Sequence, residues 1–95
     1  MHKARRPTFI ARSMASLEDF LDSDFSFSAC HVHCQFADDM LDGRALSKMS
    51  RRGVERVNFL GGQYFVRQES GWVDRNGVTV RRDFASLSRR ILWRR

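Results

Sequence analysis

The chain is poor in cysteine and has no long apolar segment, and these shortages exclude several kinds of protein. Cys30 and Cys34 are the only two cysteines among 95 residues, and they lie too close together to close the long loops through which disulfides stabilise small domains. No apolar run approaches the roughly 20 residues of a membrane-spanning helix. The basic residues 1–6 lack the apolar core of a secretion signal. We therefore expect a soluble, cytoplasmic protein with reduced thiols and no membrane partner.

The sequence also lacks internal repeats, low-complexity segments and recognisable catalytic motifs. Its 95 residues suit one domain, above the size at which a core usually depends on disulfides or metals. Eight Phe, two Trp and one Tyr help to fill that core, and a charged fraction of 29% is ordinary for a globular protein. We predict a single domain over residues 1–95, with residues 1–8 as a basic arm, and no cofactor.

Lysine is scarce among the cations, since fifteen of the seventeen are arginine. The planar guanidinium of Arg binds phosphate or carboxylate bidentately. The charge is also uneven, because residues 1–48 carry a net charge of −1 and residues 49–95 a net charge of +7. A basic half of this kind suits a polyanion such as nucleic acid, an acidic protein surface or an anionic membrane. The alternative is an ordinary solvated surface.

Residues 54–80 have the pattern of a meander of short strands. Apolar residues in short runs predict strands at residues 54–60, 63–68, 72–73 and 78–80. The sequences Gly61-Gly62 and Asn76-Gly77 between them are typical of hairpin turns. Because a hairpin pairs its strands antiparallel, this part of the chain indicates an antiparallel sheet.

The N-terminal half mixes strand and helix patterns. Residues 9–11 fit a short edge strand, and residues 17–23 fit a helix whose N-cap is Ser16. Residues 25–36 predict a strand in which the apolar side changes near Ala29. A bulge there, or cover on both faces of the sheet, would account for the change.

Residues 37–52 have a helical pattern with a break at Asp42-Gly43, and Gly53 stands where a helix C-cap belongs. A helix-turn-helix is one interpretation of this segment. Its second helix would present four cations, Arg44, Lys48, Arg51 and Arg52. The first helix, however, would be short and acidic, and acidic residues repel phosphate.

A final helix is predicted after Asp83, with Phe84, Leu87 and Ile91 on one side. The patterns together predict an α+β fold. A small antiparallel sheet of four or five strands, ending in the C-terminal meander, is packed by two or three helices on one face, the last of them basic. The predicted core consists of Leu17, Phe20, Leu21, Phe25, Phe27, Val32, Phe36, Leu46, Val57, Phe59, Phe65, Val80, Phe84, Leu87 and Ile91.

The final helix carries the main candidate binding surface. Trp93 falls on its arginine side rather than on its apolar side. Arg beside an exposed aromatic suits phosphate contact with base stacking, and Trp and Arg are also enriched in protein hot spots. The predicted nucleic-acid or partner-binding residues are Arg81, Arg82, Arg89, Arg90, Trp93, Arg94, Arg95, Arg51 and Arg52. The alternative is that Trp93 packs into the core and the arginines are only solvated.

The segment Cys30-His31-Val32-His33-Cys34 contains four potential metal ligands. In a strand the two cysteines lie about 13 Å apart and cannot share an ion, whereas His31 and His33 lie about 6.6 Å apart on one face. A third ligand would have to come from elsewhere in the chain, and Asp38 and Asp39 are candidates. The second ligand pair of a structural zinc site is missing. We predict no metal, with His31 and His33 as the remaining candidates and the cysteines buried as small apolar residues.

A ribonuclease is a further hypothesis. His31, His33 and Tyr64 on a sheet, with Arg67 to hold phosphate, are residue types that suit metal-free RNA cleavage. Size, charge and layout resemble small bacterial toxin nucleases only in general terms, and no motif supports the assignment. We therefore do not expect an enzyme.

We expect a small non-enzymatic binding protein whose Arg-rich C-terminal half docks on nucleic acid or a nucleoprotein complex. The alternative is an inhibitor of the kind that phages or mobile elements encode, including the anti-CRISPR type, which blocks a host protein complex by protein–protein binding. Salt separates the two hypotheses. Direct binding to nucleic acid loses affinity steeply with salt, whereas a protein interface with a buried aromatic and Arg core is less sensitive.

Overall fold

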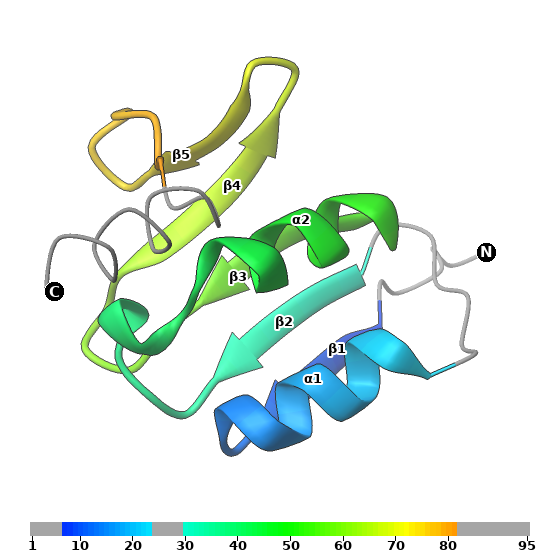
Figure 1. The fold of residues 1–95 in the computed structure, drawn as a ribbon. Coiled ribbons are helices and arrows are strands. Elements are labelled where there is room, and N and C mark those ends of the chain that lie inside the picture. Colours follow the sequence, from blue (N-terminus) through cyan, green and yellow to red (C-terminus); the bar gives the residue numbers. More distant parts are fainter. Residues whose placement is uncertain (1–6, 24–29, 82–95) are drawn as a thin grey trace, which may run out of the picture.

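Two helices pack against one face of a five-stranded sheet in the computed structural model (Figure 1). The structure describes residues 7–23 and 30–81. In chain order the elements are β1 (Thr8–Ala11), α1 (Met14–Asp22), β2 (Cys30–Cys34), the 3-10 turn η1 (Asp38–Met40), α2 (Gly43–Arg51), β3 (Val54–Asn58), β4 (Tyr64–Gln68) and β5 (Gly71–Asp74). The predicted α+β class is confirmed. Of the predicted four or five strands and two or three helices, the described residues form five strands and two α-helices.

The sheet is mixed, and its strand order is β1-β2-β3-β4-β5. The strands β1, β2 and β3 run parallel, whereas β3, β4 and β5 pair antiparallel. In the chain α1 comes between β1 and β2, and α2 comes between β2 and β3. A crossover of this kind returns the chain to the end at which the previous strand began, which makes the strands parallel. The predicted antiparallel sheet is therefore correct for the meander and wrong for the first three strands.

The strand register aligns side chains in rows across the sheet. Three successive rows are Thr8, His31, Arg56, Val66 and Val73; then Phe9, Val32, Val57 and Phe65; then Ile10, His33, Asn58 and Tyr64. The middle row faces the helices, because Val32, Val57 and Phe65 are buried there. Successive rows alternate between faces. The first and third rows therefore share the face that points away from α1 and α2, which we call the open face.

A bulge in β3 explains an irregular pattern of burial. The register shifts between Cys30 and His31, which makes Glu55 an extra residue in β3. Val54 and Val57 are three positions apart and would lie on opposite faces of a regular strand, yet both are buried. The extra residue turns both valines toward the helices, as bulges commonly re-aim side chains.

The helix α1 begins one turn earlier than predicted. Ser13 is its N-cap, and its hydroxyl oxygen accepts from the backbone amide of Ser16 at 3.1 Å. The hydroxyl oxygen of Ser16 accepts from the backbone amide of Ser13 at 3.1 Å in return, which completes a capping box. Ser16 therefore lies inside the helix, and the prediction that it is the N-cap is wrong. Leu17 and Leu21 are buried on the face that meets the sheet.

The helix α2 has the predicted break before it and the predicted glycine after it. The Asp42 carboxylate caps the helix by accepting from the backbone amide of Ala45 at 2.9 Å. Gly53 follows the C-cap with a φ of 83°, a left-handed conformation that favours glycine. Before the break the chain forms only the single turn η1. The helix-turn-helix interpretation is therefore wrong, because its first helix does not form.

The glycine turns of the meander are present as predicted. Gly61 and Gly62 adopt φ values of 92° and 94° between β3 and β4. Gly77 donates its amide to the Asp74 carbonyl at 2.9 Å and closes the turn after β5. The predicted strand at residues 78–80 is reduced to one isolated bridge, from Thr79 to β5.

The core lies between the sheet and the two helices. The predicted core residues that are buried are Leu17, Leu21, Val32, Leu46, Val57, Phe59 and Phe65. Partly buried against them are Phe20, Phe36 and Val80. The prediction missed Ala11, Leu41, Ala45, Met49, Val54 and Trp72, whereas Cys30 and Cys34 are buried as predicted for small apolar residues. The remaining predicted core positions, Phe25, Phe27, Phe84, Leu87 and Ile91, and with them the predicted basic helix, lie outside the described residues.

Candidate functional site

The part of the chain that the structure describes carries no net charge. Residues 7–23 and 30–81 contain nine Lys or Arg and nine Asp or Glu, whereas the whole chain has a net charge of +6. Residues 1–6 hold three cations and no acid, and residues 82–95 hold five arginines and one aspartate. The surplus of positive charge therefore belongs to the two terminal segments of the sequence, residues 1–6 and 82–95, rather than to the described residues.

Most of the predicted binding residues belong to the C-terminal segment. Arg82, Arg89, Arg90, Trp93, Arg94 and Arg95 lie outside the described residues. Arg81 is exposed at the end of the described chain, and Arg51 is exposed in the last turn of α2. Only three of the nine predicted binding residues, Arg51, Arg52 and Arg81, can therefore be located in the structure, and the predicted surface as a whole lies outside the described residues.

Arg52 has a structural contact that its sequence position did not reveal. Its Nη1 donates to the backbone carbonyl of Ser23 at 2.7 Å, just after α1 ends. Beside it, Lys48 Nζ lies 2.9 Å from the Asp22 carboxylate. These two contacts join α2 to α1. In the helix-turn-helix interpretation, four cations of this segment would contact phosphate. Two of them, Lys48 and Arg52, instead bind residues at the end of α1.

The open face has the most distinctive chemistry among the described residues. Its two rows contain His31, His33, Arg56, Asn58 and Tyr64, whose side chains all end in planar polar groups. His33 is exposed and the other four are partly exposed. The rest of the face consists of Thr8, Ile10, Val66 and Val73, continued at the β5 edge by Thr79.

Arg56 and Tyr64 form a stacked pair at the centre of this face. The guanidinium carbon of Arg56 lies 4.0 Å from the centroid of the Tyr64 ring, a distance typical of a cation–π contact. Arg56 Nε also donates to the Asn58 side-chain oxygen at 2.9 Å. Two contacts therefore fix the guanidinium of Arg56 before any ligand arrives, which lowers the entropy cost of using it for binding.

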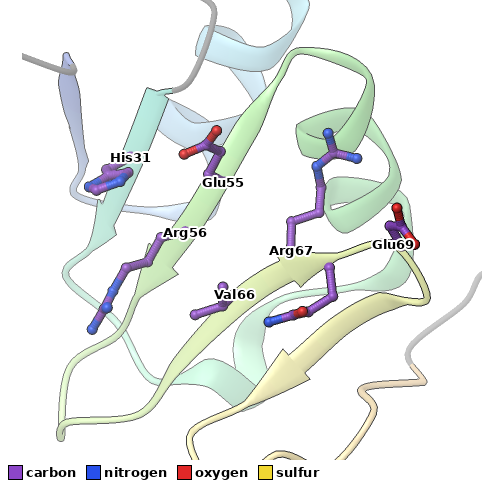
Figure 2. A pocket seen from close by; sticks show the side chains of 7 residues that line it. His31, Glu55, Arg56, Val66, Arg67 and Glu69 are labelled. Carbon is purple, nitrogen blue, oxygen red and sulfur yellow. The ribbon is translucent and has the colours of Figure 1, made fainter.

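A shallow depression of about 450 Å³ lies at the end of the sheet next to Arg56 (Figure 2). It is lined by His31, Glu55, Arg56, Val66, Arg67, Gln68 and Glu69. Figure 2 shows Arg56 and Arg67 extending in different directions from their strands. Two arginines and two glutamates balance one another there, so the depression does not concentrate positive charge.

The residues of the ribonuclease hypothesis are only partly brought together. His31, His33 and Tyr64 share the open face. Arg67 lines the depression together with His31, but its register partner is the buried Trp72, so it does not belong to the two rows of that face. The arginine that does lie among them is Arg56, which sequence reasoning missed. The available indication was Val57, a predicted core residue, because alternation along a strand places its neighbour Arg56 on the opposite face.

The Cys30–Cys34 segment divides its side chains between the two faces of the sheet. Both thiols are free and buried on the side of the helices. Burial raises the pKa of Cys34 to about 12 and also raises the pKa of Cys30, so both thiols stay protonated at neutral pH. The interpretation of the cysteines as buried apolar residues is confirmed. Within the described residues, no three His, Cys, Asp or Glu side chains are grouped so that they could hold a metal ion.

No protein-family model matches the chain. Comparison with curated proteins and with solved structures also gives no significant match. Neither α1, α2 nor η1, the helices of the described part, is long and apolar enough to cross a membrane.

Proposed function

We propose that this protein is a non-enzymatic nucleic-acid-binding protein that contacts the phosphates of a nucleic acid or nucleoprotein complex through its two basic terminal segments. The observation that carries the proposal is the separation of charge. The described domain is neutral, and the surplus of positive charge is confined to residues 1–6 and 82–95. Dense cation segments of this kind release the counterions of a nucleic acid when they bind, which is the main source of sequence-independent affinity.

The sheet register supports a joint role for the two segments. The N-terminal segment ends just before Thr8, the first residue of the row that contains His31 and Arg56. At the other edge of the sheet, Thr79 pairs with Val73 of the same row, and Arg81 follows two residues later. The two basic segments are therefore attached at opposite edges of one row of the open face.

Salt dependence of binding tests this proposal. Fluorescence anisotropy with a labelled single-stranded RNA and the same sequence as a duplex gives affinity at several salt concentrations. For wild type we expect a linear fall of log affinity with log salt. In Arg89→Gln/Arg90→Gln the slope should decrease by about one for each arginine–phosphate pair that the substitutions remove.

The matched control is Arg12→Gln/Arg75→Gln, which removes the same charge from the exposed surface of the neutral domain. It should leave the slope as in wild type. An equal change in both variants would mean that only net charge matters and would contradict a role for the terminal segment. If neither nucleic acid binds and a host protein complex is retained in a nuclease-treated pull-down, the inhibitor hypothesis replaces this one.

A further inference from the structure

We propose that the open face binds single-stranded RNA and that unpaired bases stack on the Arg56–Tyr64 pair. This inference rests on the proposed function, because the terminal segments would hold the strand while the sheet contacts its bases. Both α-helices of the described chain, α1 and α2, lie on the other face of the sheet (Figure 1). Within the described residues, no α-helix therefore covers the planar side chains of the open face.

The charge within the rows of the open face is compatible with RNA, because the one charged side chain in those rows is Arg56. None of the nine described acidic residues belongs to its rows. Three are in or near α1 and three lie around η1 and the start of α2. The other three are the bulge residue Glu55, Glu69 in the β4–β5 turn and Asp74, which pairs with the buried Phe65. The two rows therefore contain no carboxylate, but Glu55 and Glu69 line the depression beside Arg56. A strand of phosphates avoids both glutamates only if it crosses the rows on the side of His33 and Tyr64.

The side chains of the open face suit the flat surface of a base. Tyr, His and Arg are the residue types on which unpaired RNA bases stack. Arg56 is held at 4.0 Å from the Tyr64 ring and is also bound to Asn58, while His31 and His33 stand on the neighbouring strand. Sheets of similar size stack about two or three bases in this manner.

The fold favours a single strand over a duplex. Bases in a duplex are stacked on one another, and a flat sheet cannot reach their surfaces. A helix placed in a groove is the usual means of reading a duplex. Lys48 of α2 and Arg52, the residue that caps its C-terminus, are however bound to Asp22 of α1 and to Ser23 just after α1. RNA is the better partner than DNA, because its loops and ends normally present unpaired bases and its 2′-hydroxyl can bond to imidazole and amide groups.

The test compares RNA affinity between a single strand of about 16 nucleotides and the same strand annealed to its complement. Two variants remove the stacking surface while changing little else. Arg56→Lys keeps the charge and loses the plane, and Tyr64→Leu keeps an apolar side chain and loses the ring. Each should bind single-stranded RNA roughly 5- to 100-fold more weakly than wild type. Tyr64→Phe, which keeps the ring, should bind like wild type.

Binding to the duplex separates this inference from the proposed function. The duplex depends on the terminal arginines alone, so Arg56→Lys and Tyr64→Leu should leave duplex affinity and its salt slope unchanged. Equal affinity of wild type for single strand and duplex, or an equal loss on both, would overturn the inference and leave the proposed function standing. Equal affinity for single-stranded DNA would overturn the assignment to RNA.

A measurement on the wild-type chain avoids variants that fail to fold. Photo-crosslinking to thiouridine-substituted single-stranded RNA, followed by mass spectrometry, should place crosslinks at Tyr64 and at the histidines of β2. Crosslinks confined to residues 1–6 and 82–95 would overturn the inference.

Discussion

The two faces of the sheet differ sharply although they alternate residue by residue along the same strands. In β2, Cys30, Val32 and Cys34 are buried beneath the helices, whereas His33 between them is exposed on the opposite side. The helix side contains the apolar residues that stabilise the fold. The open face contains planar polar groups that contribute little to a core. Stability and binding are therefore expected to respond to different sets of neighbouring residues.

The largest contrast should appear between two adjacent residues of β4. Phe65 is buried, with its ring in edge contact with Phe59 at a centroid distance of 4.9 Å. Phe65→Ala should lower the free energy of unfolding by about 3–5 kcal/mol because it leaves a cavity. Val66→Ala, on the open face, should cost about 1 kcal/mol or less. Urea unfolding measures both, and similar costs for the two would remove the distinction between the faces.

An intermediate effect is expected at alkaline pH. The pKa of Cys34 is raised from 9.0 to about 12 by burial, so the folded chain keeps a proton that the unfolded chain loses above pH 9.0. The unfolded state then binds fewer protons, and the free energy of unfolding falls as pH rises from 9.0 toward 12. Cys34→Ala should lessen this fall, whereas His33→Ala on the open face should not. Urea midpoints measured below and within the window provide the comparison, and an unchanged fall in Cys34→Ala would count against a buried thiol.

The smallest effect on stability should come from the histidines. His31→Ala and His33→Ala should each change the free energy of unfolding by no more than about 0.5 kcal/mol, since neither side chain is part of the core. Labelled RNA incubated with wild type should stay intact on a gel, as expected for a binding protein without catalysis. RNA cleavage that either substitution abolishes would show that the open face is an active site.

Local patterns in the sequence predicted local structure well. The turns at Gly61-Gly62 and at Gly77, and the helix end at Gly53, follow from backbone conformations that glycine adopts readily. The N-cap of α1 was misplaced because Ser13 and Ser16 are the same residue type three positions apart, and the two bond to each other. A single-sequence pattern does not distinguish the two roles.

Long-range features were harder to predict. The parallel pairing of β1, β2 and β3 depends on which strands the crossovers bring together, and no adjacent residues encode it. The candidate site was affected in the same way, since His31 and Arg56 share a row only because a bulge at Glu55 shifts the register of β3 against β2. The predicted arginines of the C-terminal segment belong to residues that the structure does not describe.

The mixed sheet also has a consequence for the order in which the protein folds. The β3–β4 and β4–β5 pairings join neighbouring segments through short turns, whereas Thr8 must find His31 across a much longer stretch of chain. Closing a short loop costs less entropy and is faster. We expect pulsed hydrogen exchange to show protection in β3–β5 before β1, and simultaneous protection would contradict this order. A chain in which only β3–β5 have folded would still carry every arginine. Of the open face, however, it would have formed only the part that contains Arg56 and Tyr64.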